Sequence, residues 1–237
     1  MLADLLPAGV ACAQTHEDRA GVRLYPSEMR SLGDAVQQRR AEYMTARSLI
    51  RDAFAVLGEP EVAVPNGDHG EPIWPAGIVG SITHCTGFRA CAVAHDARFR
   101  ALGIDAEPDL PLPQSVWEEV AFGSEREWPP DAGRSEESAA SRSEPRQPLP
   151  PNARRLLFCI KEAIYKTWFP LTGTWLGFDD VEVAPPTSDG RFTAALRVTP
   201  PLVDGVPQHA FSGRWGGSRG VIYAAIAVPA SPARAAR

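Results

Sequence analysis

Apolar residues recur at helical spacing in two long stretches of the chain, and these stretches predict two long helices. The first helix is expected over residues 27–57, with Ser27 as its N-cap and Gly58-Glu59-Pro60 as its end. The second is expected over residues 153–168, stopped by Pro170. Its buried face would carry Leu156, Leu157, Ile160, Ala163, Ile164, Thr167 and Trp168.

Short apolar and β-branched runs predict strands after each helix. Three runs follow the first helix and four follow the second, at residues 78–84, 90–94, 101–107, 181–183, 192–198, 211–215 and 221–228. The proline- and glycine-rich residues 65–77 are expected to form a loop. Because both halves pair a long helix with short strands, we expect an α+β fold of two similar α/β lobes, residues 1–108 and 109–237.

One stretch breaks this pattern. From Gly123 to Asn152 the chain is rich in Ser, Glu, Arg and Pro and poor in periodic apolar residues, so residues 123–152 are expected to form a mobile or disordered insertion.

Charge and cysteine content narrow the functional classes. The chain has 237 residues and a net charge of −5, which argues against a nucleic-acid binder that relies on a global basic field. Four cysteines without a CxxC pair indicate a reducing compartment, and no apolar run is long enough to span a membrane. The first residues, with Asp4 and Pro7, are unlike a signal peptide. We therefore expect a cytoplasmic protein that binds any anionic ligand in a local basic pocket.

Lysine use points to one helix. Of 24 basic residues only Lys161 and Lys166 are lysines, and both lie in the second helix. A compact ammonium group differs chemically from the guanidinium used elsewhere, so the cluster indicates where to look for function. Glu162 lies one turn before Lys166; the pair is either an ordinary surface ion pair or part of a cleft wall. Aromatic residues crowd the end of this helix, which favours the cleft: Tyr165, Trp168, Phe169, Trp175 and Phe178.

Two acidic residues, Asp105 and Glu107, end a predicted strand. Residues i and i+2 of a strand point to the same face about 7 Å apart, so both carboxylates can converge on one cation such as Mg²⁺. The alternative is two incidental acids on a solvated edge, since like charges on one face repel each other.

Basic residues on the first helix suggest an anion-binding site, although the same residues could simply be exposed. Arg39 and Arg47 lie eight residues apart on one face of the first helix, where they could bind a phosphate or simply face solvent. His84 stands alone after a strand, without a partner at metal-ligand spacing. Neither common glycine-rich phosphate loop is present, which excludes nucleotide binding of those types.

Several ordered blocks of sequence resemble one enzyme family. Residues 80–84, 103–107 and 158–166 resemble the three signature blocks of the 4′-phosphopantetheinyl transferases of the Sfp/EntD type. Residues 39–43, 67–75, 168–172 and 175–178 are similar to the actinobacterial branch of that family, whereas Gly173 and Thr174 depart from it. The resemblance covers about residues 22–228.

The resemblance implies two pseudo-symmetric lobes with coenzyme A in the cleft between them. It implies a monomer that transfers the phosphopantetheine arm to a serine of an apo acyl, peptidyl or aryl carrier protein. Mg²⁺, or Mn²⁺, would be held by Asp105, Glu107 and Glu162, with at most the backbone of Ala106. Glu162 would act as general base, and Lys166 would bind the pyrophosphate. The remaining coenzyme A contacts would come from Arg39, Arg47 and His84 at the 3′-phosphate, and from Asn66, Gly67, Asp68, His69, Thr83 and Leu176.

Some positions depart from the family pattern. Asn66 and His69 stand where relatives place basic residues, and His69 could make coenzyme A binding pH-sensitive. Lys161 is expected to support the cleft edge or to face solvent. Two other functions remain open: a binding module without catalysis, and a Mg²⁺-dependent hydrolase of coenzyme A.

Overall fold

A computed structural model describes residues 1–33, 36–128, 152–187 and 189–231. Its helices are α1 (Pro26–Leu32), α2 (Gln37–Leu57), α3 (Gln114–Val120) and α4 (Ala153–Thr172), with short 3₁₀ helices η1 (Leu2–Leu5), η2 (Gly123–Glu127) and η4 (Phe178–Asp180). Its strands are β1 (Ala11–Thr15), β2 (Ile78–Cys85), β3 (Phe88–His95), β4 (Phe99–Pro108), β5 (Val181–Val183), β6 (Arg191–Leu196), β7 (Leu202–Val203), β8 (Val206–Pro207), β9 (Ala210–Ser218) and β10 (Val221–Pro229).

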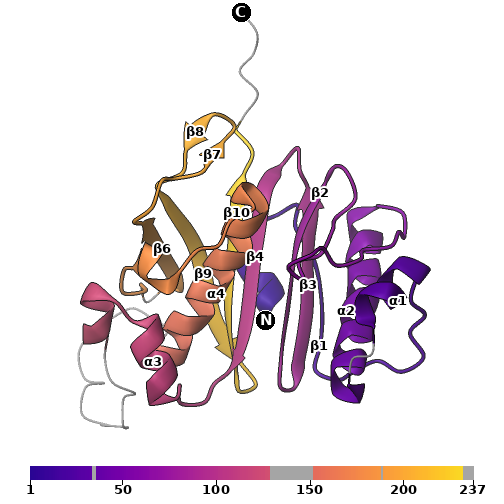
Figure 1. Cartoon of the computed structure of the whole chain (residues 1–237), viewed down its shortest axis with the longest axis horizontal. Helices are drawn as coiled ribbons and strands as arrows, with labels where there is room; N and C mark the ends of the chain where they lie inside the picture. Colours follow the sequence, from indigo (N-terminus) through magenta and orange to yellow (C-terminus); the bar gives the residue numbers. More distant parts are fainter. Residues whose placement is uncertain (34–35, 129–151, 188, 232–237) are drawn as a thin grey trace, which may run out of the picture.

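The first half of the chain forms a small sheet with strand order β1-β3-β2, and all its pairs are antiparallel. Helix α2 packs on this sheet, as Figure 1 shows. Its apolar stripe of Leu49, Ile50 and Phe54 meets Cys91 and Val93 of β3 in one buried cluster. The apolar side chains that follow the helical period in α2 and those that alternate along β3 therefore pack in one core.

The second half forms a five-stranded sheet with order β4-β10-β9-β6-β5. Helix α4 lies across this sheet (Figure 1) and buries the whole apolar face expected from the sequence. The approach is very close at Gly103 of β4. A Cβ at this position would lie 2.1 Å from the carbonyl oxygen of Ala163 and from Oγ1 of Thr167. Glycine is therefore what allows α4 to seat against β4.

Replacing Gly103 by alanine is expected to lower the free energy of unfolding by about 2–3 kcal/mol, because backbone atoms of α4 cannot yield cheaply to the methyl group. Chemical denaturation measures the effect. Gly217→Ala is the matched control, since its Cβ would meet only the carbonyl oxygen of Val221 at 3.4 Å. Equal stability of the two variants would contradict the close-packing argument.

The two sheets meet where β2 runs beside β4 (Figure 1), and we call this junction the β2–β4 seam. Side chains rather than a backbone ladder join the strands there. Oγ of Ser81 accepts the N–H of Ile104, and Oγ1 of Thr83 accepts the N–H of Ala106, both at 3.0 Å. The hydroxyl groups satisfy buried backbone donors that would otherwise have no partner. Behind the seam lies a buried apolar cluster that includes Leu2, Phe88, Leu102, Ile104 and Tyr223.

The predicted α+β class is confirmed, and every predicted strand is present within a few residues. The continuous helix predicted over residues 27–57 is wrong: α1 ends at Gly33, whose φ of 50° takes it out of helical geometry, and α2 begins at Gln37. The expected stop at Pro170 is also wrong. Helix α4 continues to Thr172 and ends at Gly173, in the left-handed conformation, with the Gly173 N–H bonded to the carbonyl of Phe169.

Strand β1, helix α3, the short strands β7 and β8 and the 3₁₀ helices were not predicted. Hydrogen bonding places β4 in the larger sheet, whereas the proposed division at residue 108 assigns it to the first lobe; that division itself stays a prediction. The predicted insertion over residues 123–152 is wrong at its start, because η2 is ordered around a fully buried Glu125. Residues 129–151 lie outside the described residues. In the described ranges, no helix is long and apolar enough to cross a membrane.

Candidate active site

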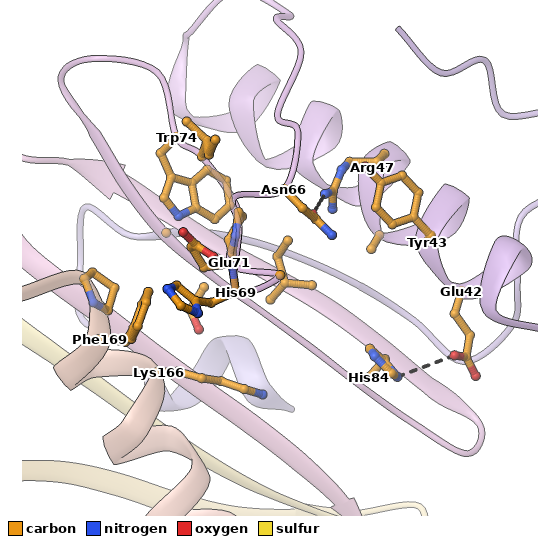
Figure 2. Close-up of a pocket in the computed structure, with 18 of the residues that line it drawn as sticks. Glu42, Tyr43, Arg47, Asn66, His69, Glu71, Trp74, His84, Lys166 and Phe169 are labelled. Atoms are coloured by element: carbon orange, nitrogen blue, oxygen red, sulfur yellow. Dashed lines mark hydrogen bonds and ion pairs between the residues drawn. The ribbon is translucent and has the colours of Figure 1, made fainter. Parts of the chain in front are cut away.

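A cleft of about 860 Å³ lies between α2 with the loop around residues 66–74 on one side and α4 on the other. Strand β2 forms part of its floor, where Trp74 packs so closely on Gly80 that a Cβ there would lie 2.6 Å from the ring. Figure 2 shows the side chains that converge on it. The predicted residues among them are Arg39, Arg47, Asn66, His69, His84, Glu162 and Lys166.

Asp105 links β4, β2 and α4 beside this cleft. Its Oδ1 accepts a hydrogen bond from Nζ of Lys166 at 2.7 Å and another from Oγ1 of Thr83 at 3.1 Å. The residue is 4% exposed, and its buried Oδ2 has no hydrogen-bond partner among the described residues. A buried carboxylate oxygen without a donor is costly, which marks Oδ2 as a position for a ligand.

Glu107 and Glu162 are electrostatically coupled to Asp105. Burial and the charge of Asp105 raise the pKa of Glu107 to about 7, although Nη1 of Arg155 lies 3.1 Å from its Oε2. Burial and the charge of Asp105 also raise the pKa of Glu162. A cation bound among these carboxylates would offset the repulsion that raises the pKa values of Glu107 and Glu162.

The donor chemistry fits a hard divalent cation, since such ions prefer carboxylate oxygens. Within the described ranges, no three His, Cys, Asp or Glu side chains are already gathered at metal-binding geometry. Glu107 turns to Arg155, and Lys166 occupies one side of Asp105. The carboxylate side chains are therefore suitable ligands for such a cation. To bind it, they must first rearrange their ion pairs with Arg155 and Lys166.

Lys166 is a cation held between acids. Burial alone would lower the pKa of its ammonium group, but Asp105 and Glu162 outweigh burial and raise it. The side chain is 29% exposed and lines the cleft, so the same charge can reach a bound anion. The predicted proximity of Glu162, Lys166 and Asp105 agrees with these contacts.

Arg47 supplies a buried positive charge on the opposite wall. It is 3% exposed, donates to Oδ1 of Asn66 and stacks 4.0 Å from the ring centre of Tyr43. Burial lowers the pKa of its guanidinium, and its Nε has no acceptor among the described residues. Arg39, on the same face of α2, is exposed at the rim. This wall is suited to an anion.

His69 and His84 complete the predicted contacts of the cleft. His69 packs edge-on against Phe169 of α4, with ring centres 5.6 Å apart, so the loop touches α4 across the cleft. His84 lies 3.8 Å from Glu42, measured from Nδ1 to Oε2 (Figure 2).

Thr83, Asp105 and Glu107 lie beside the cleft and not in its lining, and four other predicted residues also lie apart from the cleft wall. Gly67 packs on the Glu71 carboxylate, and Asp68 is exposed. Leu176 lines a separate recess of about 100 Å³, which shares Glu162 and Tyr165 with the cleft. The side chain of Ala106 is buried in the cluster behind the seam. Its backbone role at a metal stays a prediction.

Of the two alternatives expected for Lys161, exposure to solvent is wrong. The residue is 3% exposed, and its Nζ donates to Oε2 of Glu125 at 2.6 Å. Three carbonyl groups complete its shell, those of Val120, Phe178 and Val181. Lys161 ties η2 and β5 to α4 directly behind Glu162.

Other residues at the cleft were not identified individually as site residues, although residues 39–43 and 67–75 were part of the family resemblance. They are Glu42, Tyr43, Trp74 and, beside Glu107, Arg155. Some of their partners lie far along the chain, such as Arg89 for Glu42 and Glu107 for Arg155, and periodicity does not reveal such pairs.

Comparison with known proteins identifies the family of the chain. Residues 27–94 match the 4′-phosphopantetheinyl transferase N-terminal domain, and residues 101–215 match the 4′-phosphopantetheinyl transferase superfamily. The chain is 41% identical over 235 residues to 4′-phosphopantetheinyl transferase Npt of Nocardia iowensis, covering 96% of this chain and 99% of the relative. The chain belongs to the 4′-phosphopantetheinyl transferase superfamily.

Two further relatives of this transferase cover nearly the whole chain. It is 42% identical to Svp of Streptomyces mobaraensis, over 97% of this chain and 90% of the relative. It is 37% identical to PptT of Mycobacterium tuberculosis (strain ATCC 25618 / H37Rv), over 95% of this chain and 97% of the relative. Both are 4′-phosphopantetheinyl transferases. The resemblance inferred from the sequence blocks is thereby confirmed, and the chain is an enzyme of the transferase class.

Proposed function

We propose that this transferase moves the 4′-phosphopantetheine arm of coenzyme A to a serine of an apo acyl, peptidyl or aryl carrier protein, releasing adenosine 3′,5′-bisphosphate. The observation that carries the proposal is one cleft with two differently charged walls. Lys166, Glu162 and the nearby Asp105 lie on one side, and buried Arg47 lies on the other. Coenzyme A likewise carries a diphosphate and a separate 3′-phosphate.

The basic wall would bind the nucleotide end. Arg39, Arg47 and His84 are the candidates for the 3′-phosphate, since guanidinium and imidazolium groups donate charge-assisted hydrogen bonds to phosphate oxygens. Asn66, which already binds Arg47, and the neighbouring residues Gly67, Asp68 and His69 would line the nucleotide.

The acidic wall would carry the chemistry. Phosphoryl transfer depends mainly on positioning and on charge neutralisation. Lys166 would bind the diphosphate and stabilise the departing bisphosphate. Mg²⁺, or Mn²⁺, held by Asp105, Glu107 and Glu162 would supply further neutralisation of the diphosphate charge.

Glu162 is the proposed general base. Its raised pKa makes it a stronger base than an exposed glutamate, and the proton of the carrier serine would pass to its carboxylate as the serine oxygen attacks phosphorus. Binding the cation and accepting the proton would both use the Glu162 carboxylate. The oxygen that is not bound to the cation would therefore take the proton.

The test is a mass measurement. The enzyme is incubated with coenzyme A, Mg²⁺ and an apo carrier protein, and the carrier is expected to gain the mass of one phosphopantetheine group. Coenzyme A bound without any gain would favour a binding module. Coenzyme A cleaved in the absence of carrier would favour a hydrolase.

Glu162→Gln is expected to slow carrier modification about 10²-fold, because the amide can neither take the proton nor provide negative charge. Rates are followed by the same mass measurement. The control, Glu119→Gln on the exposed face of α3, is expected to retain the full rate. A Glu162→Gln enzyme as fast as the control would remove Glu162 from the mechanism.

A further inference from the structure

A row of alternating charges lies at the His84 end of the cleft. Glu42, from α2, stands between two cationic groups: its Oε1 lies 3.4 Å from Nη2 of Arg89, and its Oε2 lies 3.8 Å from Nδ1 of His84. His84 and Arg89 are directly paired across the β2–β3 hairpin. One carboxylate from a helix therefore contacts both members of a cross-strand pair (Figure 2 shows Glu42 and His84).

The carboxylate of Glu42 is held firmly, and His84 is not. Arg89 is 7% exposed and is fixed by both oxygens of Asp18, at 3.0 and 3.1 Å. Gln38 donates to Oε1 of Glu42 at 3.3 Å, and the Glu42 side chain is only 17% exposed. The His84 side chain is 56% exposed and has no other ion-pair partner among the described residues. Its ring direction thus depends on Glu42.

The contact has a defined chemical consequence. Nδ1 is the ring nitrogen that faces the carboxylate, so a ring that keeps its proton there leaves Nε2 for a ligand in the cleft. In a neutral ring Nε2 would then present a lone pair, which repels a phosphate, whereas the imidazolium presents an N–H on both sides.

Charged groups on four elements act on His84. Burial lowers its pKa, as do Lys166 of α4 and Arg89 of β3, while Glu42 of α2 and Asp105 of β4 raise it. Glu42 has the largest effect among the charged groups, so it opposes the burial that favours the neutral ring.

We propose that Glu42 is a positioning residue, which holds His84 with its Nε2 N–H directed into the cleft and so sets the affinity of this end of the cleft for a phosphate monoester. The inference rests on the proposed function, in which this end takes the 3′-phosphate of coenzyme A. If Glu42 only neutralised Arg89, its loss would change stability without changing His84 or phosphate binding.

The experiment compares Glu42→Gln, Glu42→Asp and a matched control in the full chain. NMR follows the titration of His84 in the free protein, with His84→Asn to assign its signal. Calorimetry measures binding of adenosine 3′,5′-bisphosphate and adenosine 5′-monophosphate, which differ only in the phosphate that His84 would meet. The control is Glu59→Gln, which removes a carboxylate 3.6 Å from His95, outside the cleft.

Glu42→Gln is expected to lower the pKa of His84 and to weaken bisphosphate binding about fivefold near pH 6, because a charge-assisted hydrogen bond is lost where the wild-type ring can still be protonated. Near pH 8 the loss is expected to be smaller, because burial lowers the pKa of His84 and the free ring is then largely neutral in both proteins. Monophosphate binding should change less than about twofold. Glu42→Asp should restore part of both effects, and Glu59→Gln should match the wild type in both.

An unchanged His84 titration and unchanged bisphosphate affinity in Glu42→Gln would overturn the proposal. A wild type that binds both nucleotides equally well would instead contradict the coenzyme A assignment of this end of the cleft. The titration alone then decides the Glu42–His84 contact, so the two failures are distinguishable.

Discussion

Asp105→Asn is expected to lower kcat/KM for carrier modification about 10³-fold while leaving the fold intact. The amide keeps the shape of the side chain but removes its charge. Lys166 then loses its counter-ion at 2.7 Å, and the partnerless Oδ2 position can no longer serve as an anionic ligand. Mass spectrometry of the carrier gives the rate.

A second readout separates cation binding from catalysis. Mg²⁺ is expected to raise the melting temperature of the wild type but not of Asp105→Asn, because a ligand stabilises only a state that binds it. The control is Asp109→Asn, four residues further on, where the carboxylate accepts from Nδ2 of Asn152 at 2.8 Å outside the cleft. If Asp105→Asn and this control have similar rates, the proposed role of Asp105 is wrong.

Lys161→Met is expected to lower the free energy of unfolding by about 3–5 kcal/mol, the cost of leaving Glu125 buried without its cation. The side chains of Lys161 and Glu125 are 1% and 0% exposed, and three buried carbonyl groups also lose the ammonium donor. Urea denaturation measures the change. The double variant Lys161→Met/Glu125→Gln is expected to recover part of the loss, since the unpaired charge is then gone.

An exposed ion pair provides the comparison for Lys161. Arg197 and Glu182 lie 2.6 Å apart, the same separation, but their side chains are 46% and 34% exposed. Arg197→Met is therefore expected to cost no more than about 1 kcal/mol. A similar small loss in Lys161→Met would show that the buried pair is not needed for stability.

The sequence predicted best where one face of an element meets one partner. The buried face of α4 follows the helical period over all its positions, and β5 matches its expected bounds, Val181–Val183. The predicted end of α4 was wrong because Pro170 was taken as the residue that stops the helix. The helix closes instead through Gly173 and through the bond from Nε1 of Trp168 to the carbonyl of Thr174. Such capping depends on residues that follow the proline.

The sequence predicted which residues of the candidate site share an element, but not the contacts that join different elements. The short spacing of Glu162 and Lys166, and of Asp105 and Glu107, placed each pair correctly on its own element. That Lys166 pairs with Asp105 and Arg155 with Glu107 depends on how α4 lies on β4, which Gly103 permits. Lys161 was misjudged because Glu125, its partner, lies 36 residues away in a stretch whose composition indicated disorder.

The β2–β4 seam also determines how the two halves of the chain are aligned. In a continuous sheet, backbone ladders tolerate many alignments, and apolar alternation selects one of them. Here two hydroxyl groups at alternate positions, Ser81 and Thr83, meet alternate amides of β4. A slip of one residue would present Ile82 and His84 instead, leaving buried N–H groups without acceptors. The two small side chains of Ser81 and Thr83 therefore determine how the basic wall of the cleft lies opposite its acidic wall.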